Sequence, residues 1–317
     1  MKYLRIMSVL LLAVTMVNCS KDDDKKAPTA DFTFQVNELE VTFNGSTTDA
    51  TSYMWDFGDG ETSTEKAPVH TYTSPKSYTV KFTAKGDGGE DSQTKEVVTL
   101  PSLEYLLTGG PDNADGKSWI LDKVADLKND GVGVIDNNLT ILQPIDADDL
   151  MGRISLHQAY KDVFTFKYDG SYTVDNSDHF GGSIMSAIYA NMNYKMEEFP
   201  AGDVLGMSLD MNNVPLLDIH YTPKTDAKWS VSTDDFTVNA INFTTGTVGP
   251  VNFTNKNHLI IDEYMGFRDY SMVVIIKNIN ETHMNVAIVL HAVEPSAANP
   301  DAYKLPSHML HMTFVAK

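Results

Sequence analysis

The stretch Tyr-Met-Trp-Asp-Phe-Gly-Asp-Gly at residues 53–60 decides the fold of the N-terminal part of the chain. Its rings Tyr53, Trp55 and Phe57 stand two residues apart, the period of side chains on one face of a β-strand. The glycines of Gly58-Asp59-Gly60 supply the backbone freedom of a tight turn. We therefore predict a strand that directs Trp55 and Phe57 into a core and ends in this turn.

The same alternation extends outward over residues 27–100. Further alternating runs, separated by turn clusters, lie at 32–36, 39–43 and 78–82. Short strands at this spacing predict a β-sandwich. We expect Asp56 and Asp59 to accept hydrogen bonds from turn N–H groups, because two carboxylates fall short of the roughly 6–8 oxygens that calcium takes.

Three motifs in this region resemble those of the PKD domain. Trp55–Gly60 has the family's Trp-Asp-Phe-Gly-Asp-Gly pattern, His70–Tyr72 has His-x-Tyr, and Tyr78–Val80 has Tyr-x-Val. The resemblance implies an Ig-like β-sandwich over residues 27–100. It also implies a spacer or interaction module that carries no chemistry.

The N-terminus has the pattern of an export signal. A basic start precedes the apolar run Ile6–Val17, which is too short for a bilayer span of ~20 residues. Cys19 follows and resembles the lipobox cysteine of bacterial lipoproteins, which implies removal of residues 1–18 and a lipid on Cys19. Residues 19–26 then form the lipidated cysteine and an acidic tether, similar to the export signal of Bacteroidetes surface lipoproteins. The alternatives are a secreted protein with a chance cysteine and a plain solvated tether.

Composition narrows the classes of partner. The net charge of −19 over 317 residues disfavours nucleic acid, which requires clustered Lys and Arg. It equally disfavours docking on an anionic membrane through a basic patch, so the outer membrane would be reached through the lipid alone. The length suffices for two domains.

The chain after the first domain is predicted to begin with a linker helix at 101–110, capped by Ser102 and stopped at Gly109-Gly110. Residues 111–317 then predict a second all-β domain. Candidate strands are 119–121, 163–168, 171–174, 216–221, 228–231, 236–239, 272–276, 284–290 and 308–315. Asp169-Gly170 predicts a type I′ hairpin, and we expect long loops between about 180 and 215.

The order of motifs in this second part is similar to the C-terminal domain of PKD-bearing surface lipoproteins from Bacteroidetes glycan-uptake loci. The matching segments are 116–119, 164–166, 228–230, 265–270 and 279–280. The resemblance implies a jelly-roll-like β-sandwich that binds polysaccharide or oligosaccharide for an outer-membrane transporter.

Motifs for catalysis are missing from the sequence. It lacks the Glu-x-Asp-x-x-Glu of laminarinase-type glucanases, a Gly-x-Ser-x-Gly elbow and a His-Glu-x-x-His zinc motif. We expect a protein that is not an enzyme and that needs no cofactor. A glycoside hydrolase with a dispersed carboxylate pair remains an alternative. Residues 112–116 resemble half of an EF-hand loop, but Pro111 occupies the first ligand position and no Glu follows at the required distance. A structural calcium ion elsewhere stays open.

Exposed aromatic rings are the remaining candidates for a site, because sugars stack on rings while polar groups bind their hydroxyls. Our first choice is the cluster of Tyr264, Phe267, Arg268 and Tyr270. Further candidates are Tyr160 with Lys161 and Asp162, His179 with Phe180, and Tyr189, Tyr194 and Phe199. Core packing is the alternative for each of them, and it is expected for Trp119 and Trp229. A structural or adhesion protein that makes protein contacts is the alternative function.

Overall fold

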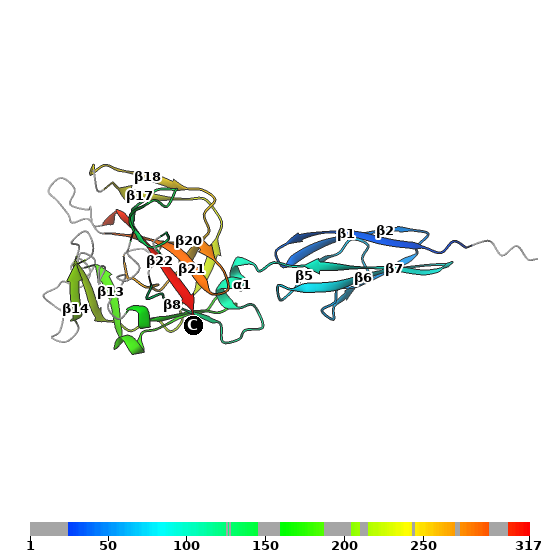
Figure 1. Cartoon of the computed structure of the whole chain (residues 1–317), viewed down its shortest axis with the longest axis horizontal. Helices are drawn as coiled ribbons and strands as arrows, with labels where there is room; N and C mark the ends of the chain where they lie inside the picture. The colour runs from blue at the N-terminus through cyan, green and yellow to red at the C-terminus, as the bar shows by residue number, and fades with distance from the viewer. Residues whose placement is uncertain are drawn as a thin grey trace, which may run out of the picture. The chain divides into compact units, whose positions relative to one another are not determined.

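The computed structural model of the chain divides into two compact units between Leu100 and Pro101 (Figure 1). It describes residues 25–124, 126, 128–144, 159–186, 204–209, 215–242, 245–269, 273–291 and 304–317. In this described part, no helix combines the length and apolar character needed to cross a membrane.

The N-terminal unit is a sandwich of two antiparallel sheets. One sheet has the order β1 (Thr29–Asn37), β2 (Glu40–Thr48), β5 (Val69–Thr71). The other has the order β4 (Thr62–Ser63), β3 (Ser52–Asp56), β6 (Ser77–Gly86), β7 (Gly89–Val98). The predicted β-sandwich is therefore confirmed.

Aromatic rings fill the space between these two sheets. Trp55 is fully buried, and its ring centroid lies 4.3 Å from that of Phe82 and 5.2 Å from that of Phe43. Its indole N–H donates to the carbonyl oxygen of Glu65 at 2.8 Å, so the one polar atom of the side chain is satisfied. Phe57 is buried as well, and both predicted core positions are confirmed.

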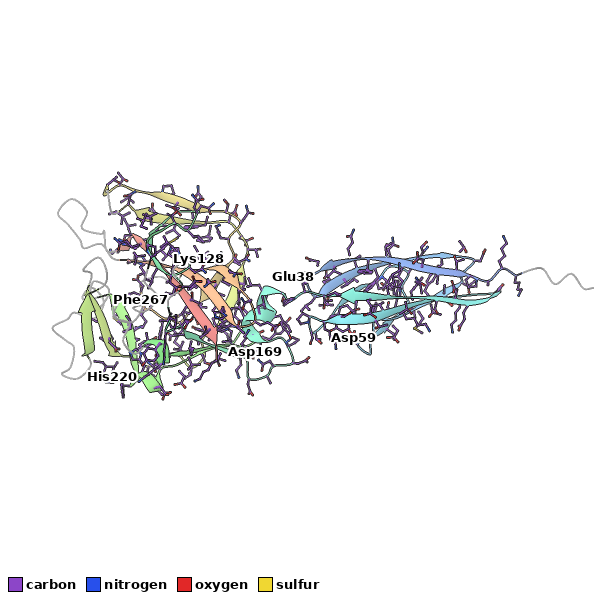
Figure 2. All side chains as sticks on the ribbon, viewed as in Figure 1. Glu38, Asp59, Lys128, Asp169, His220 and Phe267 are labelled. Atoms are coloured by element: carbon purple, nitrogen blue, oxygen red, sulfur yellow. The ribbon has the colours of Figure 1, made fainter. Side chains whose placement is uncertain are left out.

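The Gly-Asp-Gly turn is held by its own carboxylates, as predicted. Asp56 Oδ1 accepts from the N–H of Gly58, and Asp59 Oδ1 accepts from the N–H of Glu61, both at 3.0 Å. The second oxygen of Asp59 (labelled in Figure 2) lies 2.7 Å from Nε2 of His70. The His70 ring stacks on Phe57 with centroids 4.0 Å apart. Asp59 thus joins the turn to the His-x-Tyr strand.

The substitution Asp59→Ala should destabilise the N-terminal unit by about 1–3 kcal/mol, because it removes a turn bond and leaves the buried His70 ring without its carboxylate. Hydrogen exchange of peptides from residues 29–98 in the full chain would measure the loss. The matched control is Asp56→Ala, which removes a single bond at an exposed position. Equal losses for the two variants would contradict the role given to His70.

The second unit is built on a sheet that closes on itself. Around it run β12 (Tyr172–Asp175), β11 (Val163–Phe166), β8 (Lys117–Leu121), β22 (His308–Ala316), β21 (His283–Leu290), β20 (Val273–Ile279), β19 (His258–Ile261) and β16 (Trp229–Ser232). The two ends meet at an antiparallel bridge between Ser171 and Lys228. There the N–H of Trp229 donates to Gly170 O at 3.0 Å, and the N–H of Tyr172 donates to Ala227 O at 2.9 Å. These strands therefore form an antiparallel barrel.

Three insertions lie in the connections between successive barrel strands. They are the β9 (Gly131–Val134) and β10 (Ile141–Pro144) hairpin, the β13 (Gly182–Ser186), β15 (Pro215–His220), β14 (Val204–Leu209) sheet, and the β17 (Phe236–Ile241) and β18 (Val248–Phe253) hairpin. Two short 3-10 turns, η1 (Ala159–Lys161) and η2 (Ser177–His179), flank the β13–β15 sheet. The insertions cover the outer wall and one end of the barrel.

The predicted helix is present as α1 (Leu103–Thr108). Ser102 Oγ accepts from the N–H of Tyr105 at 3.1 Å, and Gly109 adopts φ 81°, so both predicted caps are confirmed. Leu107 is fully buried in the barrel core, and α1 contacts β8, β11 and β20 from different sides of the barrel. The helix therefore closes one barrel end and is part of the second unit, whereas the sequence suggested a linker.

The barrel interior is filled by large side chains. Fully buried there are Trp119, Phe164, Phe166, Tyr172 and Phe314, and Trp229 is buried beside them with 7 % of its surface exposed. The indole N–H of Trp119 donates to Leu107 O at 3.0 Å, and that of Trp229 donates to Lys167 O at 2.8 Å. Both predicted core tryptophans are confirmed. A smaller apolar cluster, which includes Phe253 of β18, packs on the outer face of β20, β21 and β22.

Two details differ from the sequence expectation. The barrel strands are sheet neighbours in the order in which they follow one another along the chain, which is a meander, whereas a jelly roll has Greek-key connections. In the hairpin at Asp169 (Figure 2), Gly170 alone has a left-handed φ, and Gly170 N–H donates to Lys167 O at 3.1 Å. This is a type I turn with a glycine bulge, because type I′ needs two positive φ angles.

The expectation of long loops between about 180 and 215 is wrong for two segments. Gly182–Ser186 forms β13 and Val204–Leu209 forms β14, and both pair with β15. These strands owe their conformation to pairing with residues far along the chain, which local patterns do not predict.

Candidate functional site

The structure places the first-choice cluster inside the protein. Tyr264, Phe267 and Arg268 are only 2, 1 and 7 % exposed. Phe267 lies where the segment after β19 meets β13, and the N–H of Arg268 donates to Ile184 O at 2.8 Å (Figure 2). The prediction that these side chains form an exposed sugar platform is therefore wrong, because the segment seals the barrel core. Tyr270 lies outside the described residues.

The other candidates divide into three groups. Cys19, Tyr189, Tyr194 and Phe199 lie outside the described residues. Tyr160 is half-buried, with the ammonium of Lys123 at 4.4 Å from its ring centroid. Phe180 is 68 % exposed and has a left-handed φ of 56°. The Lys161 ammonium lies 5.2 Å from the Phe180 ring centroid, so Phe180 is the accessible ring among the described candidates.

The structure also joins two groups that the sequence analysis named separately. His179 lies between two carboxylates, with Nδ1 2.8 Å from Asp162 Oδ1 and Nε2 2.9 Å from Asp218 Oδ2. All three side chains are buried, and the hydroxyl of Tyr264 donates to Asp162 Oδ2 at 3.0 Å. The three residues tie η1, η2 and β15 together directly behind Phe180.

The charge on His179 follows from these neighbours. Burial alone would lower the pKa of the imidazole, but its hydrogen bonds to Asp162 and Asp218 raise the pKa to about 9. Burial also raises the pKa of Asp162. At neutral pH a protonated His179 therefore donates to both carboxylates. Since none of the three side chains reaches the surface, the group positions its segments and is closed to a substrate.

The histidines of β22 are buried for structural reasons as well. Burial lowers the pKa of His308 to about 4 and that of His311 to about 3, so both rings are neutral at pH 7. Among the described residues, no group of three or more His, Cys, Asp or Glu side chains has the arrangement of a metal site.

Removing the His179 charge should change stability in a pH-dependent way. The folded pKa of His179 lies above the unfolded value of 6.5, so its stabilisation is complete below pH 6.5 and is lost as the pH rises through about 9. His179→Gln should therefore cost roughly 3 kcal/mol near pH 6 and much less near pH 9. Urea unfolding at the two pH values would measure this, with the exposed His283→Gln as control. A cost independent of pH would refute the assigned charge.

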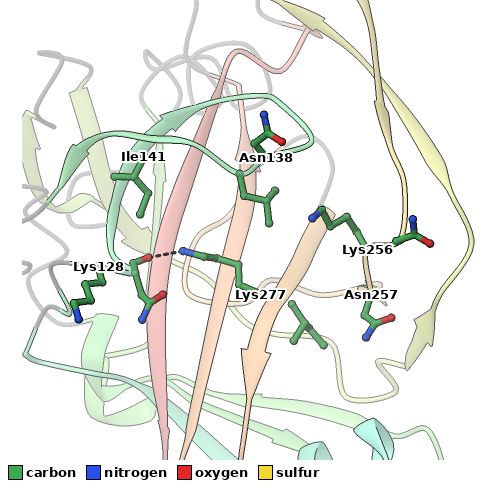
Figure 3. Close-up of a pocket in the computed structure, with 10 residues that line it drawn as sticks. Lys128, Asn138, Ile141, Lys256, Asn257 and Lys277 are labelled. Atoms are coloured by element: carbon green, nitrogen blue, oxygen red, sulfur yellow. Dashed lines mark hydrogen bonds between the residues drawn. The ribbon is translucent and has the colours of Figure 1, made fainter.

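The outer wall of the barrel carries a cavity of about 440 Å³, which we call the wall pocket (Figure 3). Three segments line it: 128–141, which includes β9 and the first residue of β10, 255–257 between β18 and β19, and 276–277 on β20. Its polar lining residues are four asparagines, Asn129, Asn138, Asn255 and Asn257, and three lysines, Lys128, Lys256 and Lys277. Leu139, Ile141 and Ile276 add apolar surface.

Hydrogen bonds between distant segments hold the walls of this pocket. Asn137 Oδ1 accepts from the N–H of Thr254 at 3.0 Å, and Asn137 Nδ2 donates to Thr254 Oγ1 at 3.2 Å. The Lys277 ammonium donates to Asn129 O at 2.9 Å (Figure 3). These bonds preform the cavity from segments far apart in sequence.

Backbone strain concentrates at the same place. Leu139 and Asn255, on opposite walls, have φ angles of 55° and 54°. The left-handed region is unusual for a leucine, and such strain is typical of functional sites. Sequence reasoning missed the pocket because its amides and lysines show no periodic pattern and come from three segments.

Comparison with known proteins identifies the first unit. Residues 25–100 match the family model of the PKD domain. Residues 25–100 are a PKD domain. A crystal structure of the PKD1 domain from the Vibrio cholerae metalloprotease PrtV is 36 % identical, with a TM-score of 0.23, and the match covers 24 % of this chain and 99 % of that chain. The PKD domain here thus contains the Asp59–His70 contact, and the wall pocket belongs to the other unit.

Matches that extend beyond the PKD domain are partial. Collagenase ColQ1 of Bacillus cereus strain Q1 is 29 % identical over 189 residues, which are 57 % of this chain and 19 % of that protein. The chain thus spans about a fifth of this curated relative. A carbohydrate-binding module of the β-sandwich superfamily matches 92 % of both chains at 13 % identity with a TM-score of 0.24, too low to indicate a shared fold.

Proposed function

We propose that this protein binds polysaccharide without breaking a bond, and that the wall pocket receives the glycan. The observation that carries the proposal is the composition of the preformed cavity, four amides beside apolar side chains. An amide offers both donors and an acceptor, which suits sugar hydroxyls, and a concave site with a few convergent polar groups is the usual form of a ligand site.

The remaining parts of the chain fit a role in holding the second unit at the cell surface. In this proposal Cys19 carries a lipid that anchors the protein in the outer membrane, and residues 20–26 are the tether. The PKD domain serves as a spacer, and the second unit captures glycan for a neighbouring outer-membrane transporter. The export signal and the single cysteine of the sequence support the anchor.

The positions of the carboxylates support binding without hydrolysis. Hydrolysis of a glycosidic bond needs two carboxyl groups ~5–9 Å apart on either side of an accessible bond. The wall pocket and a second cavity between β9 and the β17–β18 hairpin are lined by no Asp or Glu among the described residues. Asp162 and Asp218, which share His179, are buried.

The proposal is tested by affinity electrophoresis of the chain against plant, algal and host polysaccharides. The double variant Asn138→Ala/Asn257→Ala should weaken retardation about tenfold on the glycan that binds, because both amides line the pocket and both residues are exposed. The matched control is Asn252→Ala, an exposed asparagine of β18 outside the pocket.

The same gels separate the alternatives. Retardation that survives the double variant but is lost in Phe180→Ser would move the site to the exposed ring. No retardation on any glycan would overturn the proposal and favour an adhesion protein that makes protein contacts.

A further inference from the structure

We propose that the wall pocket selects a sugar that carries a carboxylate or a sulfate group. This inference rests on the proposed function and names the class of glycan. It begins from an imbalance of charge. The chain has a net charge of −19, yet Lys128, Lys256 and Lys277 line one cavity, and no carboxylate of the described residues lines it.

The three ammonium groups are not neutralised by ion pairs. Within the described residues, none of them lies within salt-bridge distance of an Asp or Glu. The nearby Asp126 carboxylate accepts from the N–H of Lys128 at 3.0 Å and from Asn129 Nδ2 at 2.6 Å, and its charge attracts Lys128 and Lys277 without a direct ion pair. Asp126 and Asp130 thus offset part of the positive charge of Lys277, but no described carboxylate holds any of the three ammonium groups in an ion pair.

Lys277 is the most constrained of the three. Its ammonium is half-buried and its hydrogen bond to Asn129 O fixes its position. Burial lowers the pKa of Lys277, while Asp130 and Asp126 behind it raise the pKa. Because this cation has lost part of its hydration, an anionic ligand group would gain a strong, charge-assisted hydrogen bond there.

The lining also lacks what a neutral glycan needs. None of the ten residues that line the cavity is aromatic, so a neutral sugar would find no ring to stack on. Binding energy must then come from the polar groups, of which the lysines are the strongest. The lysines are spread around the cavity on three segments, so the charged group of a bound sugar would meet one ammonium group while its hydroxyls meet the amides (Figure 3).

The overall negative charge of the chain does not prevent an anionic sugar from binding in the wall pocket. At physiological ionic strength the screening length is about 8 Å, so distant acidic residues are largely screened from a ligand in the pocket. The lysines at contact distance then decide which sugar binds.

The test uses the full-length protein, purified in detergent, and glycans in matched pairs. One pair is oligogalacturonate and its methyl ester, and the other is a sulfated galactan oligosaccharide and its desulfated form. Titration calorimetry should show at least tenfold tighter binding of the charged member in one pair or both, and the pair that responds distinguishes carboxylate from sulfate.

Lysine variants place the effect in the pocket. Lys128→Gln and Lys256→Gln should each weaken binding of the charged member about tenfold and leave the neutral member within about twofold. Lys277 is left intact because it also holds Asn129. The control is Lys81→Gln, which removes the same charge from an exposed position of the PKD domain.

The possible outcomes distinguish a failure of this inference from a failure of the proposed glycan binding. Equal binding within both pairs, unchanged by the lysine variants, would overturn the charge selection and leave glycan binding in place. Preference for the charged member that survives both variants would overturn the pocket as its origin. No binding of any member would overturn the inference together with the proposed function.

Discussion

The closure of the second sheet is the constraint on which the rest of this unit depends. Two backbone hydrogen bonds, at Trp229 with Gly170 and at Tyr172 with Ala227, join the first and last strands of the order. Closure removes the free sheet edges and turns one face of every barrel strand inward. The glycine bulge at Gly170 and the Trp229 indole bond to Lys167 O lie at this same seam. The glycine bulge and a large core side chain thus both stabilise the seam at which the barrel closes.

The insertions between barrel strands provide the surface features that could bind a ligand. Because large side chains such as Trp119, Phe164 and Phe166 fill this barrel, we place the ligand outside its interior. The accessible features therefore arise outside it: the wall pocket between two hairpins and β20, and the exposed Phe180 above the buried Asp162–His179–Asp218 group. Each is held by hydrogen bonds between insertions, such as the reciprocal pair of Asn137 and Thr254.

Polar groups inside the unit are stabilising where they are paired, although Asp218 Oδ1 is buried with no hydrogen-bond partner among the described residues. The protonated His179 satisfies both of its N–H groups with carboxylates, and Tyr264 adds a donor to Asp162. A buried charge without such partners would cost several kcal/mol. The rings of Tyr264 and Phe267, the first choice for stacking sugars, instead pack in the core because they follow the barrel strand β19 and cover its end. An aromatic cluster around a glycine is consistent with either role, and only its burial decides between them.

Features that depend on neighbours a few residues apart could be predicted from local sequence patterns. Alternating aromatics placed Trp55 and Phe57 in the PKD core, the Asp56 and Asp59 carboxylates secured their own turn, and Ser102 and Gly109 bounded α1. The tertiary structure decided the features that depend on pairing across long separations. These include the strands β13 and β14, the meander order of the barrel, the burial of Tyr264 and Phe267, and the pocket that brings Lys128, Lys256 and Lys277 together. The physical reason is that period and turn chemistry are local, whereas burial and cavity formation depend on which distant segments the closed sheet brings into contact.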